Sequence, residues 1–273
     1  MDVLSEIIKR KRERVEEAKR PFSPNGWKRD VRSDALEKRN LGLPHVGARH
    51  ALRRALQNDG INIIAEFKRR SPSKGVIRED ADLYSILSGY EAGGAVAVSV
   101  LTEEDYFGGS IHDLPRAKRE VDLPVLRKDF VFDEYQVYES ALHNADAILL
   151  IVAALEDEQL AKLRRLIEDE LEMDALVEVH NDAEMERAAR CGATIIGVNN
   201  RDLRTFEVSL ETSMKLAPLA PRDALLVSES GLNNASDLRR LKERGFHGFL
   251  IGEFLMRAAD PAAALRDLRN DIS

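Results

Sequence analysis

Eight short apolar segments, most of them rich in β-branched residues, recur along the chain and constrain its fold more than any other feature. Amphipathic segments lie between them; in residues 157–170, for example, Leu160, Leu163 and Ile167 recur at helical spacing. Strands that alternate with helices form parallel sheets, and near-continuous apolar strands suit a sheet that is covered on both faces. The predicted strands are Ile61–Phe67, Ala95–Leu101, Pro124–Phe130, Asp146–Val152, Asp174–Val179, Thr194–Asn199, Ala224–Ser230 and Gly248–Gly252.

Eight strand–helix units of this kind predict an α/β protein with a (β/α)₈ (TIM) barrel. An open doubly wound sheet is the alternative, but no G-x-G-x-x-G motif follows any of the predicted strands. One of the helices between strands has clear ends, because Asn181 or Asp182 is a candidate N-cap and Gly192 a candidate C-terminal glycine, and residues 233–248 repeat this pattern.

Residues 1–60 lie outside this repeat. A looser stretch with several prolines and glycines, from Pro21 to Gly47, separates an amphipathic first segment from a helix predicted within residues 47–57. We expect residues 1–60 to be an N-terminal helical extension packed on a barrel of residues 61–273, within one structural domain. The apolar stripe of the first segment consists of Val3, Leu4, Ile7, Ile8 and Val15.

Composition and charge narrow the class of protein. The chain is 44% hydrophobic and 33% charged, with a net charge of −7, which is typical of a globular protein and argues against general affinity for nucleic acid. The basic run Lys9–Arg20 is interleaved with glutamates and predicts a solvated helix face. Cys191 is the single cysteine, and no run of 18 apolar residues or apolar signal segment occurs. We therefore expect a cytoplasmic protein without a membrane or nucleic-acid partner.

Charged residues gather at the carboxyl ends of the predicted strands, where barrels of this kind build their active sites. Side chains alternate along a strand, so Glu66 and Lys68 should share the side of Ile64, and Lys128 the side of Leu126. Each residue alone could be an ordinary strand-end or helix-entry residue, but their shared position argues against coincidence. One mouth is expected to hold two ammonium groups and three carboxylates: Glu66, Lys68, Lys128, Glu178 and Glu229.

The choice of cation at two of these positions carries information. The chain has 12 lysines against 29 arginines, yet lysine stands beside arginine in both "FKRR" and "LRKD". Arginine keeps its proton in proteins, whereas the pKa of a lysine can be tuned toward neutral pH. Lys68 and Lys128 are therefore interpreted as positions that need a transferable proton.

Glycines after the last two predicted strands indicate an anion site. Gly231 in "SESGL" and Gly252 in "LIGEFLMR" stand at turns that open helices, where backbone N–H groups favour a phosphate. They could instead be plain turn glycines. No His, Cys and carboxylate cluster has metal-ligand spacing, and His180, the one histidine at a strand end, is expected on the surface.

Eight motifs follow one another along the chain: "IIAEFKRRSPSKG", "SVLTEEDYFGGS", "LPVLRKDFVFDEYQVYES", "ADAILLIV", "LVEVHN", "IIGVNNRDLRTFEV", "VSESGL" and "FLIGEFLMR". Taken together, these motifs resemble the indole-3-glycerol-phosphate synthase family over about Ile61 to Arg257. The resemblance implies a (β/α)₈ carboxy-lyase of tryptophan biosynthesis that needs no cofactor or metal. Its substrate would be 1-(2-carboxyphenylamino)-1-deoxyribulose 5-phosphate, which closes an indole ring with loss of carbon dioxide and water.

The same resemblance implies roles for individual residues. Lys128 would be the general acid of ring closure, Glu178 and Lys68 would act in dehydration, and Glu66 would orient Lys68. Glu253 stands where some relatives carry serine, so only its backbone N–H is expected at the phosphate. The implied substrate-binding residues are Asn199, Arg201 and Glu229 for polar groups, Phe107 and Phe130 for the anthranilate ring, Ser71, Lys68, Gly231 and the turn at Gly252–Glu253 for the phosphate, and Ser230 without a more specific role.

Two other hypotheses remain open at this point. One is a phosphate-metabolite sensor without chemistry, although such a sensor would not need two lysines and a base. The other is a phosphate-binding barrel isomerase or aldolase in which Lys68 or Lys128 forms a Schiff base. The expected partner is a phosphorylated small molecule, and the protein is expected to be a monomer.

Overall fold

The computed structural model describes residues 3–21, 26–40, 49–78, 80–202 and 205–270. Eight parallel strands close into a barrel in the order β1-β10-β9-β8-β7-β6-β5-β4, and β4 pairs back onto β1. The closed sheet confirms the predicted TIM barrel and rules out the open doubly wound alternative. The strands are β1 Ile63–Phe67, β4 Ala97–Leu101, β5 Val125–Lys128, β6 Ala147–Ile151, β7 Asp174–Val179, β8 Ile195–Asn199, β9 Leu225–Glu229 and β10 Phe246–Ile251, with a small hairpin of β2 Arg70–Ser71 and β3 Gly75–Val76 after β1.

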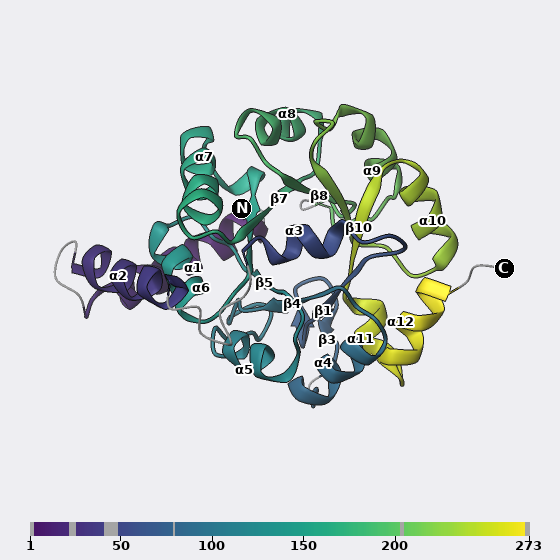
Figure 1. Ribbon diagram of the computed structural model, residues 1–273, viewed down its shortest axis with the longest axis horizontal. Helices are drawn as coiled ribbons and strands as arrows, with labels where there is room; N and C mark the ends of the chain where they lie inside the picture. Colours follow the sequence, from purple (N-terminus) through teal and green to yellow (C-terminus); the bar gives the residue numbers. More distant parts are fainter. Residues whose placement is uncertain (1–2, 22–25, 41–48, 79, 203–204, 271–273) are drawn as a thin grey trace.

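Helices follow the barrel strands and form the outer ring (Figure 1). Helix α8 begins after the N-cap Asn181, which accepts a hydrogen bond from the Glu184 backbone, and Gly192 follows it with φ +76°, as predicted. The ring consists of α4 Leu83–Ala92, α5 Asp113–Glu120, α6 Glu134–Leu142, η1 Val152–Ala154, α7 Asp157–Arg165, η2 Leu166–Glu170, α8 Asp182–Arg190, α9 Glu211–Leu216, η3 Ala217–Leu219, α10 Ala235–Glu243, α11 Glu253–Arg257 and α12 Pro261–Asn270.

A separate apolar cluster fills the inside of the barrel. Ile64, Leu126 and Leu176 belong to it, one each from β1, β5 and β7. Leu52 and Leu56 of helix α3 (Ala51–Leu56) pack into the same cluster, and α3 crosses the centre of the barrel on the near side in Figure 1. One end of the barrel is therefore closed by apolar side chains, which leaves the other end for a site.

Two further helices precede α3. Helix α1 (Val3–Lys19) buries Ile7 and Val15, whereas the side chain of Val3 lies outside the described residues. Helix α2 (Gly26–Asn40) packs against α6. The prediction of a loose stretch after Pro21 is wrong for residues 26–40, because Val31 and Ala35, four residues apart on one face, are buried. The glycines and prolines expected at residues 42–47, and Pro24, lie outside the described residues.

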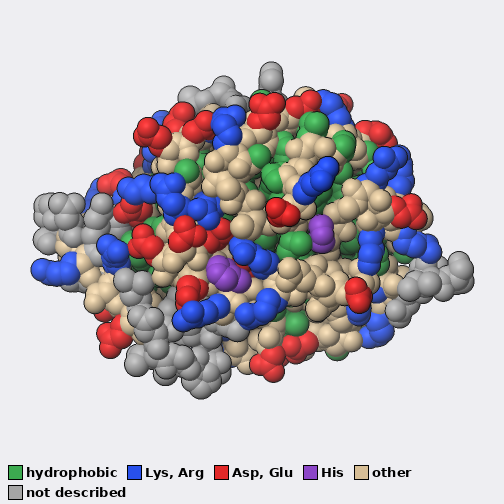
Figure 2. Space-filling model, turned by 45° about the horizontal axis from the view of Figure 1, so that its top comes forward, with side chains coloured by type: hydrophobic (Ala, Val, Ile, Leu, Met, Phe, Trp, Pro, Cys, Tyr) green, Lys and Arg blue, Asp and Glu red, His purple; other side chains and the backbone are tan. Residues whose placement is uncertain are grey.

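The surface carries charges of both signs. On the face shown in Figure 2, Lys and Arg side chains alternate with Asp and Glu side chains. Among the described residues, no helix is both long enough and apolar enough to cross a lipid bilayer.

Candidate active site

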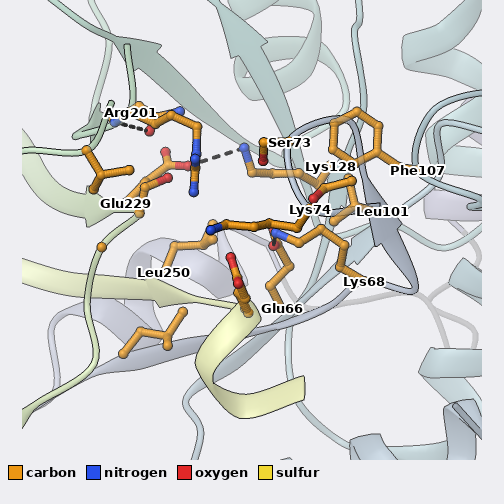
Figure 3. Close-up of a pocket in the computed structure, with 18 of the residues that line it drawn as sticks. Glu66, Lys68, Ser73, Lys74, Leu101, Phe107, Lys128, Arg201, Glu229 and Leu250 are labelled. Atoms are coloured by element: carbon orange, nitrogen blue, oxygen red, sulfur yellow. Dashed lines mark hydrogen bonds and ion pairs between the residues drawn. The ribbon is translucent and has the colours of Figure 1, made fainter. Parts of the chain in front are cut away.

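A cavity of about 560 Å³ opens at the carboxyl ends of the barrel strands, opposite α3 (Figure 3). Leu4 and Ile7 of α1 contribute apolar side chains to it. Every residue that the sequence analysis proposed for the site lines this cavity: Glu66, Lys68, Ser71, Phe107, Lys128, Phe130, Glu178, Asn199, Arg201, Glu229, Ser230, Gly231, Gly252 and Glu253.

Strand alternation explains how charged groups reach this place. On β5, Leu126 packs in the barrel interior, and Lys128, two residues further on, points the same way into the cavity. The same step leads from Ile64 to Glu66 on β1. The side chain of Glu66 is buried, and Lys68 Nζ donates a hydrogen bond to its Oε1. Glu66 therefore holds the ammonium group of Lys68 at the edge of the cavity.

Lys128 lies between two carboxyl groups. Its Nζ is 2.9 Å from Glu178 Oε2 and 3.2 Å from Glu229 Oε2. Burial acts to lower the pKa of Lys128, but the charges of Glu178, Glu229 and Glu66 outweigh burial, so the pKa lies above its ordinary value. This direction is opposite to that of a lysine tuned toward neutral pH. The group is a permanent ammonium ion in the free site and can give its proton only to a strongly basic atom.

The two carboxyl groups around Lys128 have different environments. For Glu178, burial acts to raise the pKa, but Lys128 and His180 outweigh it and hold the pKa well below its usual range. For Glu229, burial, together with the charge of Glu178, outweighs Lys128 and raises the pKa to about 8. Glu229 Oε1 also has no hydrogen-bond partner within the described part of the chain. At neutral pH the site therefore contains a carboxylate at Glu178 and a carboxylic acid at Glu229.

His180 is a site residue that the sequence analysis missed. The prediction of a surface position is wrong, since the side chain is only 11% exposed and its Nε2 lies 3.3 Å from Glu178 Oε1. Its Nδ1 lies 3.0 Å from Glu184 Oε2. Burial acts to lower the pKa of His180, but these two carboxylates raise it to about 10, so His180 is an imidazolium ion that holds Glu178 in place. The signal in the sequence was the spacing, because His180 follows Glu178 by two residues and precedes Glu184 by four.

Glycine leaves room for two of the buried carboxyl groups. A Cβ atom on Gly197 of β8 would lie 2.1 Å from Glu229 Oε1, and one on Gly252 would lie 2.3 Å from Glu66 Oε1. Gly252 has φ −120°, so its position needs space and not a left-handed backbone. After β9, by contrast, Ser230 and Gly231 both have positive φ, at +67° and +79°, which turns the chain sharply at the rim of the cavity.

Aromatic side chains form one wall of the cavity. The rings of Phe107 and Phe130 pack at a tilt, with their centroids 6.2 Å apart. The loop that carries Phe107 is folded around the carboxylate of Glu103, which accepts hydrogen bonds from the backbone N–H groups of residues 105, 106 and 107. Asp129 also borders the cavity, but its carboxylate contacts Thr102 and Arg127. The wall is thus suited to a flat apolar ring.

Polar groups surround the opening. Asn199 Oδ1 accepts a hydrogen bond of 3.0 Å from the Arg201 backbone, and Arg201 Nη1 donates to the Phe206 carbonyl at 3.2 Å. Glu253 forms an ion pair with Arg257, with 3.1 Å between Glu253 Oε1 and Arg257 Nε. Lys74, from the turn between β2 and β3, also lines the cavity (Figure 3) and was missed by the sequence analysis, as was Arg257. Within the described ranges, no group of three His, Cys, Asp or Glu residues could hold a metal ion.

Comparison with known proteins gives a consistent result. A family model described as indole-3-glycerol phosphate synthase matches residues 4–268. Indole-3-glycerol phosphate synthase from Lachnoclostridium phytofermentans is 42% identical over 270 residues, covering 98% of this chain and 99% of that protein. The protein of the same name from Carboxydothermus hydrogenoformans is 45% identical over 268 residues, covering 97% and 98%.

A likeness among solved structures concerns the fold alone. The crystal structure of 3-hexulose-6-phosphate synthase from Salmonella typhimurium superposes with a TM-score of 0.62 at 12% identity, covering 76% of this chain and 96% of that one. At this identity the match supports the barrel architecture and carries no argument about the reaction.

Proposed function

The chain belongs to the indole-3-glycerol phosphate synthase family, and from that premise we propose how the residues of its cavity divide the reaction among them. The protein is a carboxy-lyase of tryptophan biosynthesis. It closes the indole ring of 1-(2-carboxyphenylamino)-1-deoxyribulose 5-phosphate, with loss of carbon dioxide and then of water. The observation that carries the division of roles is the ammonium ion of Lys128 between a carboxylate and a carboxylic acid.

Lys128 is the general acid of ring closure. As the aromatic carbon attacks the ketose carbonyl, negative charge develops on the carbonyl oxygen, and this oxygen becomes basic enough to take the proton of an ammonium group. Two contacts of 2.9 and 3.2 Å orient the Lys128 ammonium in advance. Loss of carbon dioxide then restores the aromatic ring.

Glu178 and Lys68 act in the dehydration that follows. Glu178 is ionised at neutral pH and is held on both sides by Lys128 and His180, so it is the base that takes a proton from the ring intermediate. Lys68, held by Glu66, lies at the same mouth and supplies a proton to the leaving hydroxyl group. Water then departs, Glu178 releases its proton, and Lys128 and Lys68 each regain a proton from solvent.

The remaining residues of the cavity hold the substrate. Phe107 and Phe130 flank the anthranilate ring, because their tilted pair forms the apolar wall. Asn199, Arg201 and Glu229 face the polar groups of the chain between ring and phosphate. The phosphate lies at the turns after β1, β9 and β10, against Ser71, Lys68, Ser230, Gly231, Gly252 and the backbone of Glu253.

The wider setting of the enzyme is part of the same proposal. We expect it to act in the cytoplasm as a monomer of one structural domain, with residues 1–60 as an extension of the barrel. The single cysteine and the net charge of −7 support these expectations. The proposed chemistry uses no cofactor and no metal.

Direct turnover tests the proposed function. The purified protein is expected to generate indole fluorescence when it is mixed with the carboxyphenylamino substrate. Binding of the substrate without fluorescence would instead favour a sensor. A covalent adduct trapped by borohydride in the presence of substrate would favour Schiff-base chemistry at Lys68 or Lys128, which the proposed mechanism does not contain.

An anion is expected to bind at the phosphate turns even without the rest of the substrate. Inorganic phosphate or sulfate should occupy the cavity beside Ser71, Gly231 and Gly252, because turns that open helices favour anions and the cationic residues Lys68 and Arg257 line the same cavity. A crystal soaked in sulfate would test this expectation. An anion seated elsewhere, with these turns empty, would contradict it.

A further inference from the structure

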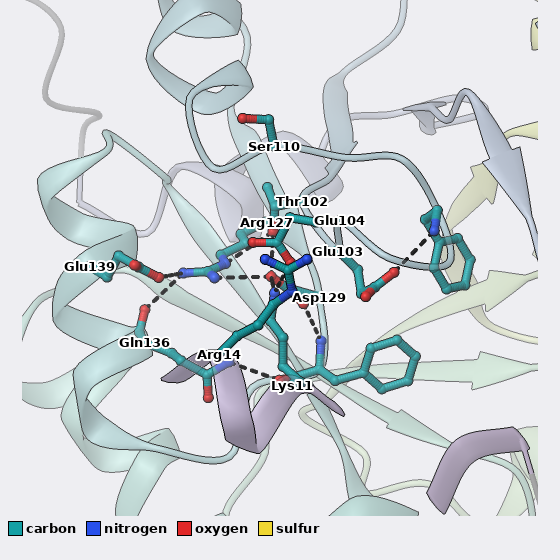
Figure 4. A network of polar contacts seen from close by, with 12 residues as sticks. Lys11, Arg14, Thr102, Glu103, Glu104, Ser110, Arg127, Asp129, Gln136 and Glu139 are labelled. Carbon is teal, nitrogen blue, oxygen red and sulfur yellow. Dashed lines mark hydrogen bonds and ion pairs between the residues drawn. The ribbon is translucent and has the colours of Figure 1, made fainter. Parts of the chain in front are cut away.

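We propose that Lys11, on helix α1, is a positioning residue that fixes Lys128 and the aromatic wall of the cavity. The inference rests on the role proposed for Lys128. The sequence analysis expected Lys9–Arg20 to be a solvated helix face, and for Lys11 that expectation is wrong. Its side chain is only 4% exposed, and its Nζ lies 2.9 Å from Asp129 Oδ2 and 2.9 Å from Glu104 Oε2 (Figure 4).

The contact with Asp129 reaches the neighbour of Lys128 in the sequence. Along β5, Lys128 points into the cavity, and Arg127 and Asp129 on either side of it point away toward the surrounding elements. Asp129 Oδ2 accepts hydrogen bonds from Thr102 at 2.6 Å and from Arg127 at 2.9 Å, besides the Lys11 ion pair. The backbone is therefore held immediately after Lys128 by a carboxylate that α1 helps to anchor.

Arg127 anchors the strand immediately before Lys128. It is fully buried, and its guanidinium group donates hydrogen bonds to the Gln136 carbonyl and to Glu139 on α6, at 3.1 and 2.9 Å (Figure 4). It also donates to Ser140 of the same helix at 3.0 Å. Lys11, Asp129 and Arg127 thus form a row of alternating charges around one short segment of chain. A shift of α1 would be transmitted through this row to Lys128.

The contact with Glu104 reaches the other side of the aromatic wall. Glu104 belongs to the loop after β4 that carries Phe107, and Asp129 precedes Phe130. Lys11 therefore links the two segments that present the paired rings. Arg14, one turn further along α1, adds two hydrogen bonds of 2.5 and 2.6 Å to Asp105 on the same loop.

Lys11 carries a positive charge in this buried position. Burial acts to lower its pKa, and Arg127 acts in the same direction, but Asp129 and Glu104 outweigh both, so the pKa lies above its ordinary value. Without the ammonium group, Asp129 keeps its contacts with Arg127 and Thr102, and the barrel should still fold. The loss of the ammonium group would release the fixed distance between the Phe107 loop and the segment Asp129–Phe130. Small displacements of catalytic groups lower the reaction rate strongly.

The test compares Lys11→Met with Lys9→Met, a control at an exposed position of the same helix. Single-turnover rate, kcat and KM would be measured at a temperature at which thermal unfolding shows each variant to be folded. Lys11→Met is expected to slow the chemical step by about 10-fold or more, within the range for misplaced catalytic groups, and to raise KM. Lys9→Met should keep native values for all three constants.

The variant Glu104→Gln tests the Lys11–Glu104 contact separately from the Lys11–Asp129 contact. This variant keeps the Lys11–Asp129 contact and weakens the tie to the Phe107 loop, so KM should rise more than kcat falls. If Lys11→Met does not fold, Glu104→Gln becomes the test of the positioning role of Lys11. Native kcat and KM in folded Lys11→Met, or in Glu104→Gln when Lys11→Met does not fold, would overturn the proposal.

Lys128→Arg, measured in the same assay, separates this inference from the proposed function on which it rests. A native rate in Lys128→Arg would refute the role of Lys128 itself. A native rate in folded Lys11→Met beside an inactive Lys128→Arg would refute only the positioning role of Lys11.

Discussion

Lys128→Arg is expected to slow the chemical step by about 10²-fold or more, the usual scale for a general acid. Substrate affinity should change far less. Arginine keeps the positive charge, and its planar group can pair with the carboxylate of Glu178 and donate to the carboxyl group of Glu229, which lie 2.9 and 3.2 Å from the lysine nitrogen. Its head is wider and planar, so it would not place a proton where the ammonium group of Lys128 does.

The measurement is the single-turnover rate together with the substrate dissociation constant. Lys128→Met is the matched comparison, since it removes both charge and proton and should impair binding as well as chemistry. In that variant Glu178 also loses a contact that keeps it ionised. Near-native turnover in Lys128→Arg would show that position 128 supplies only charge, and the acid would then have to be sought at Lys68.

Much of the barrel and its mouth could be predicted because strand geometry is local. A period of two residues places Lys128 on the side of Leu126, and the parallel barrel brings the carboxyl ends of all strands to one opening. The same rule brought Glu66 and Glu178 to that opening. Strand alternation alone shows that residues two positions apart lie on the same side of the sheet, so this prediction needs no knowledge of contacts with other segments.

The parts that could not be predicted depend on contacts between segments far apart in the sequence. Lys11 looks like one more cation in a mixed-charge helix until α1 meets Asp129. Residues 26–40 form a helix although they contain few apolar residues, because Val31 and Ala35 pack near α6. His180 was assigned to the surface because the sequence does not show that β7 and the start of α8 place Glu178 and Glu184 on either side of it.

The division of protonation between Glu178 and Glu229 was also beyond the sequence. Both are glutamates at strand ends beside the same lysine, and only the position of His180 and the unpartnered Oε1 of Glu229 separate them. Environment and not residue type therefore gives two identical side chains different protonation states. The difference in protonation can be tested by comparing the variants Glu178→Gln and Glu229→Gln.

Glu178→Gln should lower the single-turnover rate by about 10²–10⁴-fold, the range for loss of a general base. Glutamine keeps the shape of the side chain but cannot accept a proton, and it leaves Lys128 and His180 facing a neutral group. Glu229→Gln should have a far smaller effect at neutral pH, because Glu229 is already uncharged there. Equal losses in the two variants would contradict the division of roles.

The pH dependence of stability tests the protonation of Glu229 without substrate. Its pKa is raised from 4.5 to about 8 on folding, so between these values the folded protein binds a proton that the unfolded chain has lost. The contribution of Glu229 to the free energy of unfolding therefore falls as pH rises from about 4.5 to about 8 and is constant above that range. Glu229→Gln should remove this decline, and denaturant titrations across that range would measure the free energy of unfolding of both proteins. If Glu229 is ionised in the folded protein, the free energy of unfolding should instead change with pH by the same slope in the variant and in the native chain.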